Sequence, residues 1–165
     1  MIDNKGQVSA ELLFFTGVLI VIVMLSVIFI AQEQELNQAM AAARNGVNEG
    51  LATSSSAIYP EDTYRDYSNS KTDLLYPYSV KIVNISYNDM GYDKNFEKKW
   101  IQFKVYAKTS KSFTNDELVS IGDRINYNLR KSIAISFNST PSTNKLYNPV
   151  FSNHYVFTTA NVKWV

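Results

Sequence analysis

Few side chains in this sequence could carry out catalytic chemistry. The chain has no cysteine and a single histidine, His154, so thiolate chemistry is excluded and histidine-based metal or triad chemistry is not expected. His154 stands alone in a stretch of alternating apolar and polar residues, and we interpret it as a strand residue. The acidic pairs Glu61–Asp62 and Asp116–Glu117 are interpreted as loop and helix-start charges. Without a glycine-rich phosphate loop or a nucleophile elbow, we expect neither an enzyme nor a cofactor.

One carboxylate, Glu11, stands where a carboxylate is unexpected. It lies in the stretch NKGQVSAELLFF (residues 4–15), just where a long apolar segment begins. A charged carboxylate at the centre of a membrane helix costs roughly 3 kcal/mol, and less near the interface, where Glu11 would lie. In a helix bundle, a neighbouring subunit's terminal amine or another polar group could compensate this charge, so Glu11 would favour one register between subunits. Alternatively, Glu11 is a carboxylate at headgroup level without a partner.

The apolar segment, residues 12–31, contains no charged side chain. At about 1.5 Å per residue it would form about 30 Å of helix, the thickness of a bilayer's hydrocarbon core. A small domain could hardly bury such a helix. A cleaved secretory signal would be shorter and would end in small residues, whereas Phe29 stands near the end here. The length favours an uncleaved membrane anchor, and Lys5 before it with Glu33 and Glu35 after it predict a head outside the cytoplasm.

Beyond this segment, apolar residues continue at helical spacings of 4, 3, 4 and 4: Leu36, Met40, Ala43, Val47 and Leu51. No proline precedes Pro60, so the pattern predicts one helix from Gln7 to Ser54, about 70 Å long. Gly46 and Gly50 would share one face of this helix. They could allow the close approach of another backbone, or they could merely fray the helix end.

Residues 6–13, GQVSAELL, resemble the class III signal sequence of archaeal type IV pilin-like proteins. That signal has a short polar leader, the pattern Gln-x-Ser-x-Glu and then the hydrophobic stretch; here the pattern is Gln7, Ser9 and Glu11. The resemblance implies that a membrane prepilin peptidase cuts after Gly6. Gln7 would become the mature amino terminus, open or cyclised, and Glu11 the fifth residue, where type IV pilins carry a glutamate. The mature protein would keep its hydrophobic helix.

The resemblance ends near residue 32, and the remaining chain is interpreted from its pattern alone. Residues 53–73 are polar and predict a connecting loop. Residues 78–87 alternate with one phase slip, which predicts a bulged strand. A turn region at 88–99 and a cleanly alternating strand at 100–108 complete a predicted antiparallel hairpin.

A capping box formed by Thr114 and Glu117 predicts the start of a second helix. This amphipathic helix would end near Ala134, and its apolar residues are Leu118, Ile121, Ile125, Leu129 and Ile133. Residues 136–149 read as a polar connection, and residues after 149 as one or two strands. The predicted fold class is α+β, with the long amino-terminal helix and the second helix packed on a small antiparallel sheet. Such a head differs from the all-β heads of archaellins and many archaeal pilins.

Two sequence patterns match acceptors for N-glycosylation, at Asn84 and at Asn138. Asn138 lies in a predicted loop, whereas Asn84 lies within a predicted strand. Several tyrosines gather around the predicted connecting loop, and we interpret them as packing residues or contacts between subunits: Tyr59, Tyr64, Tyr67, Tyr76 and Tyr78.

The 165 residues, of net charge +1, suffice for one membrane segment and one modest domain, and this charge gives no reason to expect a nucleic-acid partner. We predict a leader (1–6), a transmembrane and filament-core helix (7–54) and an extracytoplasmic head (55–165). The predicted function is that of a structural subunit of a type IV pilus-like surface filament used for adhesion. Its predicted partners are the prepilin peptidase, the membrane before assembly, the pilus assembly machinery and other copies of itself.

Two alternatives to this function remain open from the sequence. The chain could be a membrane-anchored extracytoplasmic binding module that never polymerises. It could also be a minor pilin that primes or tips the filament.

Overall fold

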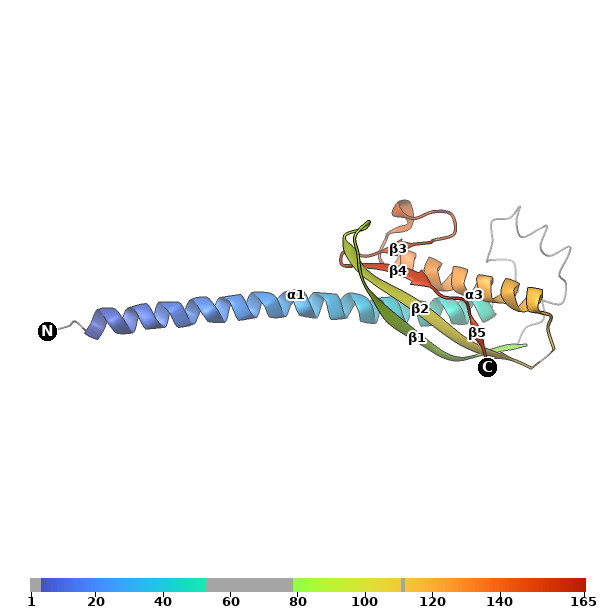
Figure 1. The fold of residues 1–165 in the computed structure, drawn as a ribbon, viewed down its shortest axis with the longest axis horizontal. Helices are drawn as coiled ribbons and strands as arrows, with labels where there is room; N and C mark the ends of the chain where they lie inside the picture. Colours follow the sequence, from blue (N-terminus) through green and yellow to red (C-terminus); the bar gives the residue numbers. More distant parts are fainter. Residues whose placement is uncertain (1–3, 53–78, 111) are drawn as a thin grey trace. The chain divides into compact units, whose positions relative to one another are not determined.

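The structure of the protein, a computed structural model, describes residues 4–52, 79–110 and 112–165. The chain divides into two compact units, Met1–Asn37 and Gln38–Val165. Helix α1, Asn4–Ala52, runs without interruption through the boundary between them (Figure 1). The predicted loop at 53–73, the predicted domain boundary at residues 54 and 55, and the cluster of tyrosines at 59–78 lie outside the described residues.

The second unit contains a five-stranded sheet, and its strand order is β1-β2-β4-β3 with β5 beside β2. The strands are β1 (Val80–Asp93), β2 (Lys98–Thr109), β3 (Val150–Phe151), β4 (Tyr155–Thr159) and β5 (Lys163–Trp164). With the second helix, α3, this confirms the predicted α+β class. The prediction of a purely antiparallel sheet is wrong, because β4 and β5 run parallel to β2. Between β2 and β4 the chain passes through α3 and then β3, which returns it to the end of the sheet where β2 began.

The predicted bulge in the first strand is confirmed. The register between β1 and β2 shifts between Ile82 and Asn84, so Val83 has no partner on β2. Val83 is 53% exposed, although it is β-branched and apolar. The break in the alternation of the sequence therefore corresponds to a β-bulge in this edge strand.

The predicted long turn at 88–99 is wrong, because the two strands continue through most of it. They end at Asp93 and resume at Lys98, leaving a four-residue turn in the described hairpin. A second register shift lies between Asp89 and Tyr92, where Gly91 has a φ of +88° that favours glycine. This part of β1 is exposed on both faces. Its residues can therefore be polar, and their sequence resembles that of a turn rather than that of an alternating strand.

Helix α3, Asn115–Ser136, begins with the predicted capping box. The amide of Thr114 donates to the Glu117 carboxylate at 2.7 Å, and the amide of Glu117 donates to the Thr114 hydroxyl at 3.4 Å. The helix ends two residues beyond the predicted end at Ala134. A short 3-10 helix, η2 (Thr140–Ser142), follows it.

The carboxyl-terminal segment forms three strands rather than the predicted one or two. His154 lies in the bend between β3 and β4, so its interpretation as a strand residue is wrong. The amide of Ser152 donates to the Tyr155 carbonyl at 3.0 Å, and the amide of Tyr155 donates to the Ser152 hydroxyl at 3.1 Å. These bonds close the tight reversal between β3 and β4 that contains His154.

Aromatic rings form the centre of the core between the sheet and the helices. Phe157 on β4 is fully buried. Its ring centroid lies 6.0 Å from that of Phe103 on β2, 5.8 Å from that of Phe137 at the end of α3, and 5.7 Å from that of Tyr155. Strands β2 and β4 thus meet α3 through one continuous aromatic cluster.

Small residues on the second half of α1 face this core. The buried residues of α1 beyond Gln38 are Ala39, Ala42, Ala43, Gly46 and Val47, whereas Met40 and Leu51 of the predicted stripe are only half-buried. The buried face is therefore rotated toward the small residues, because α3 lies close against it.

The surroundings of Gly46 and Gly50 decide between close packing and fraying of α1. A Cβ atom added to Gly46 would overlap the main-chain oxygen of Asn128 and lie 2.6 Å from the Ser132 Cβ. A Cβ added to Gly50 would lie 2.8 Å from the Asn128 side-chain nitrogen. Both glycines lie within α1 and do not fray it. Gly46 allows α1 to approach the main chain of α3, and Gly50 leaves room for the Asn128 side chain.

The surroundings of Tyr127 on α3 predict that the second unit is sensitive to alkali. Its side chain is buried, and its ring meets that of Tyr147 edge-on at 5.5 Å. Burial, and then the neighbouring Tyr147, raise the pKa of Tyr127 above its ordinary value of 10.0, and Arg130 partly offsets this shift. Because the folded state favours the neutral phenol, its stabilisation is complete below that ordinary pKa. It is lost as the pH rises through the raised pKa of the folded state.

We therefore expect the Tyr127→Phe protein to lose less stability than the wild type between pH 9 and pH 11, although Phe removes a hydroxyl. Thermal unfolding of the full chain in neutral-detergent micelles across this range measures the difference. Tyr92→Phe is the matched control, because Tyr92 is 64% exposed. Parallel stability curves for wild type and Tyr127→Phe would contradict the prediction.

Candidate functional site

The first unit presents an apolar helix surface that no described residue of this unit covers. The large apolar side chains between Leu12 and Ile30 are all exposed, from 43% at Val18 to 76% at Leu13. By length and composition, α1 is able to cross a membrane. Burying one large apolar side chain is worth about 1.5–3 kcal/mol, so a surface of this extent requires lipid or other protein around it.

The two hydroxyls within the apolar run are satisfied inside the helix. Thr16 donates to the Leu12 carbonyl at 2.5 Å, and Ser26 donates to the Ile22 carbonyl at 2.8 Å. Side chains bonded back to the preceding turn leave no unpaired donor for a hydrocarbon environment. The run is thus compatible with lipid along its whole length.

Gly17 makes a shallow depression in this otherwise bulky surface. A Cβ added there would meet no atom within 4 Å, in contrast to Gly46 and Gly50. The depression is lined by Phe14, Val18, Val21 and Ile22. Small residues of this kind let a second helix approach closely in a membrane, and nothing in the described chain fills this position.

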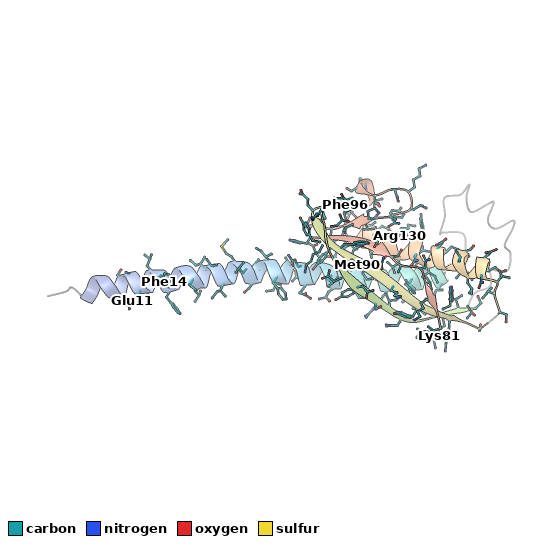
Figure 2. The ribbon with its side chains drawn as sticks, in the orientation of Figure 1. Glu11, Phe14, Lys81, Met90, Phe96 and Arg130 are labelled. Carbon is teal, nitrogen blue, oxygen red and sulfur yellow. The ribbon has the colours of Figure 1, made fainter. Side chains whose placement is uncertain are left out.

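Glu11 lies on α1 immediately before the apolar run and is exposed (Figure 2). Residues three and four apart share a helix face, so the carboxylate lies on the same face as Phe14 and Phe15. Among the described residues, no hydrogen-bond or ion-pair partner for it is found. The structure thus places a carboxylate beside a large apolar surface, without an intramolecular partner in the described part of the chain.

The remaining residues of the signal pattern also lie in α1. Gly6 and Gln7 belong to its first turns, and Ser9 is exposed. Cleavage after Gly6 stays a prediction, as does the role of Gln7, Ser9 and Glu11 as a peptidase signal.

No known protein family, no curated protein and no solved structure matches this chain. The fold itself is compatible with a pilin-like protein: a long amino-terminal helix, apolar in its first half, is combined with a small mixed sheet and a second helix. The comparisons add no function to this description.

The two glycosylation acceptors lie in different surroundings. Asn138 follows α3, is exposed and has a φ of +51°. Asn84 is exposed within β1, opposite Tyr106 on β2. Each side chain is accessible to an enzyme, and modification at either position stays a prediction.

The candidates for catalysis are not brought together. Asp116 is exposed at the start of α3, and Glu117 is held in the capping box. Glu61 and Asp62 lie outside the described residues. Among the described residues, no group of histidine, aspartate and glutamate side chains could hold a metal ion.

The sequence analysis missed a group of lysines on the sheet: Lys81, Lys104, Lys108 and Lys163. The alternation of β2 already placed Lys104 opposite the core face. Lys108 follows from the same alternation, whereas Lys81 and Lys163 could be added only once the register of β1 and the parallel pairing of β5 were known.

Proposed function

We propose that this chain is the precursor of a subunit of a type IV pilus-like surface filament. The observation that supports the proposal most is the exposed apolar surface of α1 with Glu11 at its start. A helix of this kind is stable in a bilayer as a precursor, and it could later be buried among the same helices of neighbouring subunits. The signal pattern around Gly6 and Gln7 supplies the step that separates the two states.

In this mechanism the helix exchanges lipid for protein. Because lipid tails are as apolar as leucine side chains, hydrophobicity alone does not favour this exchange, and packing and polar contacts must drive it. The depression at Gly17 offers a place for close packing, and Glu11 offers a charge to be compensated. Since every subunit carries the same surfaces, a head-to-tail contact that does not close into a ring generates a helical polymer. The filament would display many heads outside the cell, which favours adhesion through multivalency.

The main alternative is a membrane-anchored binding module that does not polymerise. It explains the apolar run and the head, but it assigns no role to Glu11. A minor pilin would share the processing step and differ only in its place in the filament.

Processing is tested by the mass and the amino-terminal sequence of the protein recovered from its native cell surface. We expect a chain that begins at Gln7, with an open or cyclised terminus. A chain beginning at Met1 would contradict the proposal and leave the simple anchor. A chain beginning near Gln32 would indicate an ordinary secretory signal, and Glu11 would then have no role.

A further inference from the structure

The solvent-facing side of β1, β2 and β5 carries a basic surface. Along β2, Phe103, Val105 and Ala107 are buried, whereas Lys104 and Lys108 alternate with them and point to the other side. Lys81 on β1 is the cross-strand partner of Lys108, and Figure 2 shows it at the start of its strand. We call Lys81, Lys104, Lys108 and Lys163 the lysine face.

Two side chains of the lysine face, Lys104 and Lys163, lie near one aromatic ring. Lys163 on β5 is the partner of Tyr106 in the parallel pairing with β2. The Lys104 ammonium lies 5.8 Å from the centre of the Tyr106 ring, and the Lys163 ammonium lies 5.9 Å from it. Cation–π attraction of this kind holds ammonium groups at defined positions. The ring therefore serves to gather two positive charges.

Among the described residues, no acidic side chain forms an ion pair with these lysines. The strand segments that carry them, residues 80–88, 102–109 and 163–165, contain no aspartate or glutamate. Like charges directly opposite each other on a sheet are destabilising, and Lys81 and Lys108 are such a pair. An anionic partner would relieve this repulsion.

Neighbouring side chains indicate the type of anion. Asn84 and Ser86 on β1 pair with Tyr106 and Lys104 and lie on the same side of the sheet, and Gln102 lies further along it. Amides and hydroxyls of this kind can donate to and accept from sugar hydroxyls. Nucleic-acid surfaces instead combine basic residues with aromatic rings on which bases stack, whereas the Tyr106 ring already binds two ammonium groups.

We propose that the lysine face binds an acidic polysaccharide, with lysines pairing its carboxylates and the neighbouring polar side chains bonding its hydroxyls. This inference rests on the proposed function only in placing the head outside the cell. The binding surface itself belongs to a single subunit. Failure of filament assembly would therefore leave this proposal standing, and the reverse also holds.

The experiment uses the full chain in neutral-detergent micelles, produced in a host without N-glycosylation because Asn84 lies among the lysines. The probe is a fluorescently labelled oligomer of polygalacturonic acid, and anisotropy measures its dissociation constant. We expect binding that weakens as salt is added, and about tenfold weaker binding by Lys104→Gln/Lys108→Gln. The matched control is Lys94→Gln/Lys145→Gln, which removes the same charge from the hairpin turn and a loop and should bind like the wild type.

A third variant, Lys104→Arg/Lys108→Arg, keeps the charge and should retain binding, which separates charge from local folding. Equal weakening in both glutamine variants, or no binding by the wild type, would overturn the proposal. Tighter binding of single-stranded oligothymidylate of the same charge than of the polyuronate would also overturn it, in favour of nucleic acid.

Discussion

Replacing Glu11 with alanine is expected to abolish filaments while the precursor still enters the membrane. The substitution removes a charge whose insertion costs up to roughly 3 kcal/mol at a helix centre and less near the interface, so insertion is not impaired. In the filament, the same change removes the polar group that we propose to fix the register between neighbouring helices. Electron microscopy of the cell surface and immunoblots of the membrane and sheared-filament fractions measure the two effects separately. We expect filament yield to fall by about tenfold or more.

Two further variants show whether the effect belongs to this carboxylate. Glu33→Ala removes a similar exposed charge from the same helix beyond its apolar run, and it should assemble normally. Glu11→Gln keeps the size and hydrogen-bonding capacity without the charge. Recovery by glutamine would assign the role to hydrogen bonding, whereas failure would assign it to charge. Normal filaments from Glu11→Ala would leave the non-polymerising anchor as the better function.

Features governed by neighbours in the sequence could be predicted well. The apolar run within α1, the Thr114 capping box and the bulge after Ile82 all depend on residues a few positions apart. In each case the residue types decide the local backbone: absence of charge and proline for the helix, a hydroxyl and a carboxylate three residues apart for the cap, and a slip in alternation for the bulge.

Features governed by distant pairing could not be predicted. The parallel pairing of β4 and β5 with β2 depends on how α3 returns the chain, and β5 consists of only two residues, Lys163 and Trp164. A strand of that length has no periodicity to detect. For the same reason the complete lysine face could not be predicted, since Lys163 joins the other lysines only through this pairing.

The candidate site shows the same division. Glu11 could be singled out because a carboxylate at the start of a membrane-spanning apolar run is costly, and both the charge and the run are visible in the sequence. The packing role of Gly46, by contrast, depended on where α3 lies. Sequence spacing placed Gly46 and Gly50 on one face but left open what that face meets.

The Gly46→Ala protein is expected to be destabilised, although alanine is the better helix former by about 1 kcal/mol. The added Cβ would overlap the Asn128 carbonyl and crowd Ser132, and α1 and α3 would have to separate. Overpacking of this type costs typically 1–3 kcal/mol, so the melting temperature of the full chain in micelles should fall by several degrees. Gly17→Ala is the matched control, because a Cβ there meets nothing; it should leave stability unchanged or raise it.

Gly50→Ala separates a backbone clash from a side-chain clash. Its Cβ would lie 2.8 Å from the Asn128 amide nitrogen and 3.1 Å from the Asn128 Cγ, both of which Asn128→Ala removes. The double variant Gly50→Ala/Asn128→Ala should therefore be less destabilised than the sum of its single changes. Asn128→Ala should not rescue Gly46→Ala, because the atoms that crowd Gly46 are the main chain of Asn128 and the Cβ of Ser132. Rescue of both glycine variants would show that Gly46 meets the side chain of Asn128 rather than its main chain. Rescue of neither would show that the Asn128 side chain is not what crowds Gly50.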